Sequence, residues 1–89
     1  MIVEFKKSFV KDLKKHSRDK KLLQRVREII QEVEDAASLA DINNLKKMKA
    51  EGFYYRIRSG DYRVGLIIDS ETATFVRVLH RSDIYRYFP

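Results

Sequence analysis

The stretch YYRIRSGDYRVGLIID, from Tyr54 to Asp69, sets the topology of the sheet, because apolar and polar side chains alternate along it with a period of two. This alternation predicts strands at residues 53–58 and 61–69, joined by a two-residue loop at 59–60. The segment TATFVRVLH at 72–80 repeats the pattern after a second short loop. Together they predict an antiparallel meander with one face turned towards a core.

The N-terminal half predicts a strand and two helices. IVEF at 2–5 has the composition of a short strand, and Asp19 is a candidate N-cap for the second helix. Two apolar stripes have helical spacing: Phe5, Phe9, Val10 and Leu13, and then Leu22, Val26, Ile29, Ile30, Val33 and Ala37. We therefore expect an α+β fold of βααβββ order, with two N-terminal helices packed on one face of a small, mainly antiparallel sheet. Residues 45–52 are expected to form a basic connector and residues 81–89 a short C-terminal tail.

Length and composition limit the function classes. The 89 residues are expected to form one domain, 1–89, since a chain of this size has room for one core. There is no cysteine, and His16 and His80 lie far apart in sequence, so no metal or cofactor is expected. The first ten residues lack the apolar block of a signal peptide, and no apolar run is long enough to span a bilayer. We therefore expect a cytoplasmic protein.

The positive charge is concentrated in one part of the chain. The net charge is +6, and residues 45–63 alone carry Lys46, Lys47, Lys49, Arg56, Arg58 and Arg63 against Glu51 and Asp61. After Lys49 every basic residue is an arginine. Arginine is favoured where a planar fork binds phosphate or carboxylate, or stacks on a flat ring. The switch predicts an anion site, although a basic surface that serves solubility is an alternative.

The predicted loops define two faces of the meander. With loops at residues 59–60 and 70–71, Arg56 lies opposite Arg63. The open face then carries Tyr54, Arg56, Arg58, Asp61, Arg63, Gly65, Val76, Val78 and His80. The core face carries Phe53, Tyr55, Ile57, Tyr62, Val64, Leu66, Ile68, Phe75 and Leu79, and Arg77 falls among these apolar residues without an explanation.

An anion would relieve the repulsion between two facing arginines. Alternatively, Asp61 or Asp83 neutralises one of them. Gly65, expected opposite Tyr54, is predicted to leave a bare patch that a flat base can approach, unless the glycine only marks a strand kink.

His80 is the histidine expected on the arginine face, where it could carry a proton near neutral pH. Tyr85 is a second candidate from the tail, whereas Tyr87 and Phe88 are expected to anchor the tail to the sheet. No nucleophile elbow or phosphate-binding glycine loop is present. Arginine, histidine and tyrosine are sufficient for metal-free RNA cleavage, in which the 2′-hydroxyl of the RNA attacks the adjacent phosphate.

The strand order, the segment YYRIRSGDYRVGLIID and the C-terminal segment VLHRSDIYRYFP together resemble the RelE/ParE superfamily of toxins from toxin–antitoxin systems. The resemblance covers essentially the whole chain. It implies either a ribosome-dependent endoribonuclease that cuts messenger RNA, as in RelE-type members, or an inhibitor of DNA gyrase, as in ParE-type members. It also implies a small antitoxin that wraps the toxin.

The resemblance also implies roles for single residues. Arg63 matches the RelE arginine that contacts the scissile phosphate, and Tyr85 a tyrosine that orients the nucleotide. Arg56 and Tyr54 stand where RelE has functional lysines, and His80 and Arg81 fall near its last catalytic arginine. Arginine does not lose its proton as a lysine can. His80 is therefore favoured as the proton carrier over Tyr54 and Tyr85, because a phenol titrates near pH 10.

The leading hypothesis is thus a messenger-RNA interferase that inhibits translation on the ribosome. Its expected catalytic residues are Arg56, Arg63, His80, Arg81 and Tyr85, and its expected RNA-binding residues are Lys46, Lys47, Lys49, Tyr54 and Arg58. The expected partners are messenger RNA on the ribosome and a cognate antitoxin, with a toxin–antitoxin heterotetramer as the candidate assembly. The alternatives are a gyrase inhibitor without nuclease activity and a non-catalytic RNA-binding module.

Overall fold

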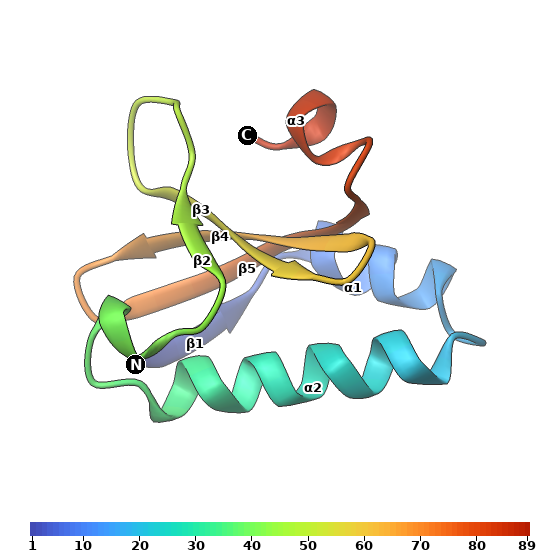
Figure 1. Cartoon of the computed structure of the whole chain (residues 1–89), viewed down its shortest axis with the longest axis horizontal. Coiled ribbons are helices and arrows are strands. Elements are labelled where there is room, and N and C mark those ends of the chain that lie inside the picture. The colour runs from blue at the N-terminus through green and yellow to red at the C-terminus, as the bar shows by residue number, and fades with distance from the viewer.

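The sheet has five strands in the order β1-β5-β4-β3-β2, and the computed structural model describes all residues, 1–89 (Figure 1). The elements are β1 (Ile2–Phe5), α1 (Lys7–Lys15), α2 (Lys20–Asp35), a 3-10 turn (Leu39–Asp41), β2 (Leu45–Lys47), β3 (Tyr54–Ser59), β4 (Tyr62–Asp69), β5 (Thr72–His80) and α3 (Ile84–Tyr87). Strand β1 pairs with β5 in parallel, and every other pairing is antiparallel.

The predicted α+β architecture is confirmed, with three additional elements: the 3-10 turn, β2 and α3. Helices α1 and α2 lie on one side of the sheet, and the short helix α3 lies on the other (Figure 1). Strand β2 forms within the segment predicted to be a connector, and α3 forms within the predicted tail. None of the helices has the length and apolar composition needed to cross a bilayer.

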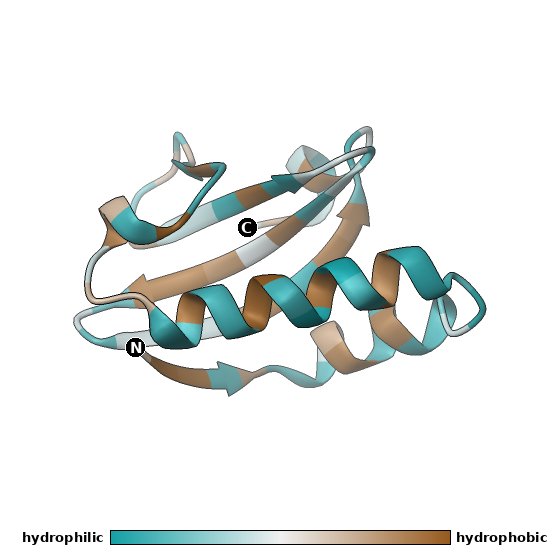
Figure 2. Ribbon diagram, turned by 60° about the horizontal axis from the view of Figure 1, so that its bottom comes forward, coloured by the Kyte–Doolittle hydropathy of each residue, from teal (hydrophilic) through white to brown (hydrophobic).

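The main core lies between the two long helices and the sheet. The apolar stripe along α2 is visible in Figure 2, and its residues Leu22, Val26, Ile29 and Val33 are buried. They pack with Phe9 of α1 and with apolar side chains of β3, β4 and β5. Asp19 caps α2 as predicted, because its carboxylate accepts a hydrogen bond from the Leu22 backbone N–H at 3.1 Å.

A bulge in β5 changes which of its side chains face the helices. The β4–β5 pairing follows the predicted register from Asp69–Thr72 to Leu66–Phe75, and then shifts by one residue, so that Gly65 pairs with Arg77. Consequently Val78 is buried in the main core, whereas Leu79 packs on the opposite face. The predicted faces of these two residues were therefore wrong, because periodicity does not reveal an extra residue in one strand.

The bulge also explains Arg77. Asp12 of α1 is only 3% exposed, and its carboxylate accepts hydrogen bonds from Arg77 Nε at 2.8 Å and Nη2 at 3.2 Å. It also accepts one from the backbone N–H of Val78, at 2.9 Å. The hydrogen bond to Asp12 raises the pKa of Arg77. This arginine therefore neutralises a buried carboxylate and ties α1 to the irregular part of β5.

The loop between β3 and β4 lies one residue later than predicted. Ser59 pairs with Tyr62 and Arg58 with Arg63, so the two loop residues are Gly60 and Asp61. Gly60 has a φ of 57°, and a glycine with positive φ at the first loop position is typical of a type II′ turn. The predicted loop at Ser59 and Gly60 was wrong by one position.

Candidate functional site

The candidate site is a group of basic side chains on the face of the sheet opposite α1 and α2. Arg58 of β3 lies directly across from Arg63 of β4, while Arg56 lies across from Gly65. The predicted pairing of Arg56 with Arg63 was therefore wrong. Two arginines still face each other across the strands, because Ile57 and Val64 occupy the alternate, core-facing positions. Lys46 of β2 extends the group, since it pairs with Arg56.

The three strand arginines have no acidic partner. No carboxylate lies within 4.0 Å of Arg56, Arg58 or Arg63. Asp61 reaches only Arg81, at 4.0 Å, and both of these side chains are largely exposed. The alternative in which Asp61 or Asp83 neutralises one of the facing arginines is thus not observed.

Arg63 experiences this positive charge most directly. Its Nη1 donates to the backbone carbonyls of Gly60 at 2.8 Å and Tyr62 at 2.9 Å, which hold the guanidinium over the turn. Partial burial lowers the pKa of Arg63, and the charges of Arg56 and Arg58 lower it further. A phosphate placed here would gain hydrogen bonds to guanidinium groups and relieve their mutual repulsion.

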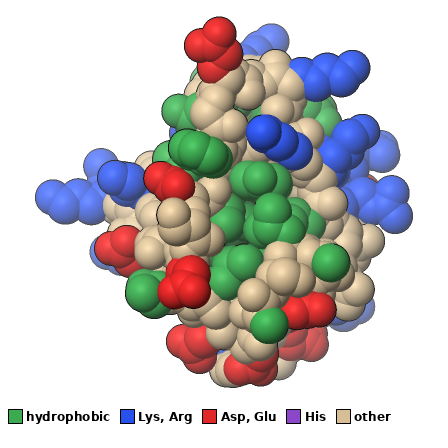
Figure 3. Space-filling model, turned by 90° about the vertical axis from the view of Figure 1, so that its left-hand side faces the viewer, with side chains coloured by type: hydrophobic (Ala, Val, Ile, Leu, Met, Phe, Trp, Pro, Cys, Tyr) green, Lys and Arg blue, Asp and Glu red, His purple; other side chains and the backbone are tan.

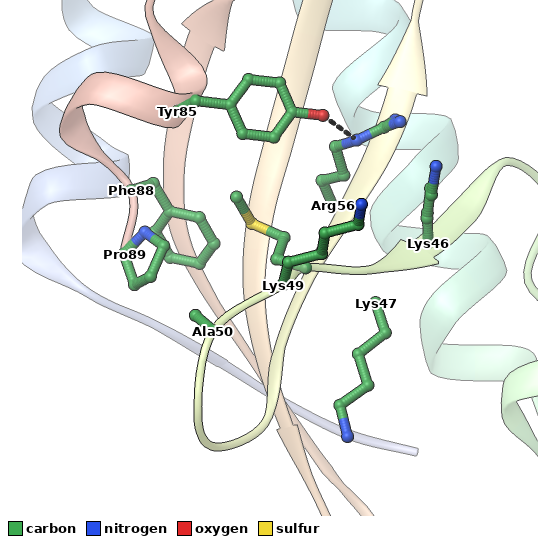
Figure 4. A pocket seen from close by; sticks show the side chains of 9 residues that line it. Lys46, Lys47, Lys49, Ala50, Arg56, Tyr85, Phe88 and Pro89 are labelled. Carbon is green, nitrogen blue, oxygen red and sulfur yellow. Dashed lines mark hydrogen bonds between the residues drawn. The ribbon is translucent and has the colours of Figure 1, made fainter.

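Tyr85 brings an aromatic ring to the edge of this cluster. Its hydroxyl oxygen accepts a hydrogen bond from Arg56 Nε at 3.0 Å, and the residue is 68% exposed (Figure 4). A pocket of about 420 Å³ lies between α3 and the segment that follows β2. The side chains of Lys46 and Lys49 extend towards Arg56, whereas Lys47 points away from it (Figure 4). The pocket therefore combines cationic side chains, which are suited to a phosphate, with an open ring on which a base can stack.

The predicted placement of His80 was wrong. It pairs with Tyr62, and their ring centroids are 5.8 Å apart in an edge-to-face arrangement, with His16 on the same tyrosine at 5.2 Å. Tyr62 packs against the main core, so both histidines lie on the helix side of the sheet. His80 Nδ1 lies 2.9 Å from Ser82 Oγ. The bulge in β5 causes this change, and Leu79 takes the place across from Arg63.

The predicted bare patch at Gly65 is filled. The ring of Phe88 lies against this glycine, and Phe88 is 2% exposed. Tyr54, predicted to bind RNA, packs edge-on against the same ring at 5.6 Å. Phe88 anchors the C-terminal segment as predicted, whereas Tyr87 is 53% exposed and does not.

A second apolar cluster supports the site and was missed in the sequence. Met48, Ile84 and Phe88 form its buried centre, with Tyr54, Val76 and Leu79 packed around them. The spacing of Ile84 and Phe88, four residues apart, was the available signal, because such residues share one face of a helix. The structure shows no group of three histidine, aspartate or glutamate side chains arranged to hold a metal ion.

The arrangement can bind a polyanion and stabilise additional negative charge on it. Arg81 lies close enough to Arg63 to lower its pKa, so four arginines act on one region. Figure 3 shows that charges of opposite sign are separated on one face of the molecule. Most acidic side chains in view lie in the lower half, and most lysines and arginines lie in the upper half. An apolar patch lies between them.

Comparison with known proteins gives consistent matches over at least nine-tenths of the chain. The model of the ParE toxin of the type II toxin–antitoxin system parDE matches residues 3–85. Toxin RelE3 of Methanocaldococcus jannaschii is 46% identical over 93 residues, which cover 100% of both chains.

Solved structures agree with these matches. The RelB–RelE antitoxin–toxin complex from Methanococcus jannaschii contains a chain with 44% identity and a TM-score of 0.73, with 97% of this chain and 99% of that chain covered. The toxin–antitoxin complex RelBE2 from Mycobacterium tuberculosis contains one with 28% identity and a TM-score of 0.66, with 90% and 96% covered.

Proposed function

The chain belongs to the ParE toxin family of type II toxin–antitoxin systems, and we propose that it is an endoribonuclease that cleaves messenger RNA on the ribosome without a metal ion. The observation that carries this proposal is the group of Arg56, Arg58 and Arg63, which has no carboxylate partner and lies beside the exposed ring of Tyr85. Unpaired arginines next to a stacking surface are suited to a phosphate with a neighbouring base.

The proposed reaction uses the nucleophile of the substrate itself. The 2′-hydroxyl of one nucleotide attacks the adjacent phosphorus, and the bond to the 5′-oxygen of the next nucleotide breaks. Negative charge accumulates on the non-bridging oxygens in the transition state, where guanidinium groups of Arg56, Arg63 and Arg81 stabilise it. Tyr85 stacks on a base and fixes the angle of attack. DNA lacks the 2′-hydroxyl and would not react in this way.

The reaction requires two proton transfers: the 2′-hydroxyl loses a proton and the leaving 5′-oxygen gains one. The placement of His80 on the helix side removes the imidazole that was expected there. The ammonium groups of Lys46 and Lys49 and the hydroxyl of Tyr85 carry transferable protons beside Arg56. We place the proton donor for the leaving 5′-oxygen among these three groups, and the proton of the attacking 2′-hydroxyl passes to solvent water. The arginines have an electrostatic role only.

A cognate antitoxin is the expected protein partner. The solved relatives from Methanococcus jannaschii and Mycobacterium tuberculosis are toxin–antitoxin complexes. We propose that the antitoxin of this chain presents carboxylates to the arginines and apolar side chains to the patch visible in Figure 3, within a toxin–antitoxin heterotetramer. We place the free toxin in the cytoplasm, where ribosomes are found.

The activity can be tested by primer extension on a defined messenger RNA. Cuts within the coding region that require both ribosomes and this protein, and that disappear with Arg63→Ala, would support the interferase. Absence of cuts together with blocked DNA supercoiling by purified gyrase would instead support the gyrase inhibitor. Ribosome binding without cuts and without an effect on gyrase would leave an RNA-binding module.

A further inference from the structure

The ring of Phe88 lies so close to Gly65 that no larger residue fits at this position without a shift. A Cβ atom added to Gly65 would lie 2.7 Å from Cδ2 of the Phe88 ring and 2.9 Å from Cγ and Cε2. Such distances essentially never occur for a real Cβ. The φ of Gly65 is not in the left-handed region, so the backbone conformation does not require a glycine there. What requires it is the ring that occupies the space.

Phe88 and Ile84 fix the short helix α3 to the sheet. Ile84 is 0% exposed and Phe88 2%, and the Phe88 backbone N–H donates to the Ile84 carbonyl at 2.9 Å. A helix of four residues is not stable by itself, so its position depends on these anchors. The ring of Tyr54 contacts Phe88 from the side, and Met48 completes the cluster.

Tyr85 lies between the two anchors but points in another direction. It follows Ile84 by one residue, so its side chain is rotated by about 100° around the helix, away from the buried face. Its ring is exposed, and its hydroxyl is held only by Arg56 Nε, at 3.0 Å. Figure 4 shows Phe88 below the ring of Tyr85, on the same turn of chain. The ring therefore has no packing of its own that would keep it over the arginines.

Gly65 connects these contacts to the arginine cluster. It is the strand partner of Arg56, so the residue that receives the Phe88 ring lies directly across β3–β4 from the arginine that holds Tyr85. A ring displaced from Gly65 would carry α3 away from the sheet and Tyr85 away from Arg56. We infer that Phe88, seated on Gly65, is a positioning residue for RNA cleavage that holds Tyr85 over Arg56. This inference rests on the proposed function.

The test compares Phe88→Ala, Tyr85→Ala and the double variant in single-turnover cleavage at saturating programmed ribosomes. We expect Phe88→Ala to lower the rate by about tenfold to a hundredfold, since small displacements of a positioning group have effects of this order. We also expect the double variant to be no slower than Tyr85→Ala, because both changes remove one function. Ribosome affinity should stay within about threefold of wild type. Tyr87→Ala, an exposed tyrosine of the same helix, is the control and should retain the rate.

The contact between Phe88 and Gly65 can also be tested by substituting the glycine, with Gly65→Ala. We expect this change to lower the cleavage rate in the wild-type background and to have no further effect in the Phe88→Ala background, where the ring is absent. Equal losses in both backgrounds would show that Gly65 acts independently of Phe88 and would overturn the inference. Additive losses of Phe88→Ala and Tyr85→Ala would overturn it as well.

An NMR measurement separates this inference from the proposed function. In wild-type protein the Nε–H of Arg56 should show a cross-relaxation signal to the ring protons of Tyr85, since the two groups are hydrogen-bonded. The signal should disappear in Phe88→Ala and persist in Tyr87→Ala. If the wild type does not cleave RNA, the proposed function fails while this signal still decides the positioning role. Retention of the signal in Phe88→Ala would overturn that role whatever the activity.

Discussion

Arg77 and Arg63 are arginines of neighbouring strands with opposite surroundings. The buried carboxylate of Asp12 on α1 accepts hydrogen bonds from two nitrogens of Arg77 and raises its pKa. Arg63 lies on the open side without a carboxylate, and burial together with Arg56 and Arg58 lowers its pKa. The fold neutralises the charge of Arg77 with a carboxylate but leaves the charge of Arg63 without one. The partner of a charge, and not the residue type, thus distinguishes a structural arginine from a candidate functional one.

If this distinction is correct, Arg63→Ala should remove activity and leave the fold intact. We expect the single-turnover rate of messenger-RNA cleavage to fall by about 10²–10³-fold, the usual effect of removing one group that stabilises transition-state charge. The free energy of unfolding should change by less than about 1 kcal/mol, because the substitution removes both a repulsion and two hydrogen bonds to the turn, which oppose each other. Denaturant unfolding measured beside the cleavage assay tests both parts. A large loss of stability would place Arg63 in the same class as Arg77.

Asp12→Ala should have the opposite profile. It leaves Arg77 and the Val78 backbone N–H without their acceptor, and we expect the free energy of unfolding to fall by about 2–3 kcal/mol. The protein that remains folded should keep its cleavage rate. Urea unfolding with Glu34→Ala as the exposed acidic control measures the difference. A change below about 0.5 kcal/mol would mean that the buried ion pair does not stabilise the fold.

An anion should stabilise the open face specifically. Pyrophosphate at about ten times its dissociation constant should raise the free energy of unfolding by about 1.4 kcal/mol, if it binds only the folded state. The increase should shrink in Arg63→Ala and persist in Arg27→Ala, a variant of an exposed arginine on α2. Equal shifts in all three proteins would indicate a general salt effect and not a site.

His80→Ala should change the cleavage rate by less than about threefold, because His80 lies against Tyr62 on the helix side. Cleavage kinetics from pH 5.5 to 8 on matched amounts of folded protein provide the measurement. A loss of about a hundredfold, together with the disappearance of a titration near neutral pH, would return the proton-carrier role to the histidine.

The sequence predicted the elements with strong periodicity and failed where one residue changes a register. IVEF and TATFVRVLH were placed at their observed bounds, and the apolar stripe of α2 with its Asp19 cap was recognised. The loop at Gly60 and the bulge beside Gly65 were not, because neither interrupts the alternation of nearby residues. The error in the loop misplaced Arg56 relative to Arg63. The missed bulge put His80 on the wrong face of the sheet.

In the candidate site, too, the sequence revealed residue types but not the contacts between distant residues. The arginines of β3 and β4 were identified because arginine replaces lysine after Lys49, which is a property of the sequence alone. Strand β2 was missed because three residues at a sheet edge, two of them lysines, give no recognisable alternation. The seat of Phe88 on Gly65 depends on a contact between residues 23 positions apart, and nothing local in the chain indicates it.

The contact between Arg63 and the scissile phosphate can be measured with phosphorothioate RNA. A messenger RNA that carries sulfur at one or the other non-bridging oxygen of the cut site is cleaved on ribosomes, and the ratio of the two rates is compared between proteins. We expect wild type and Arg27→Ala to prefer one diastereomer by about tenfold or more, and Arg63→Ala to lose most of that preference, because the guanidinium binds one particular oxygen. The same ratio in Arg63→Ala as in wild type would contradict the assignment of Arg63 to the phosphate.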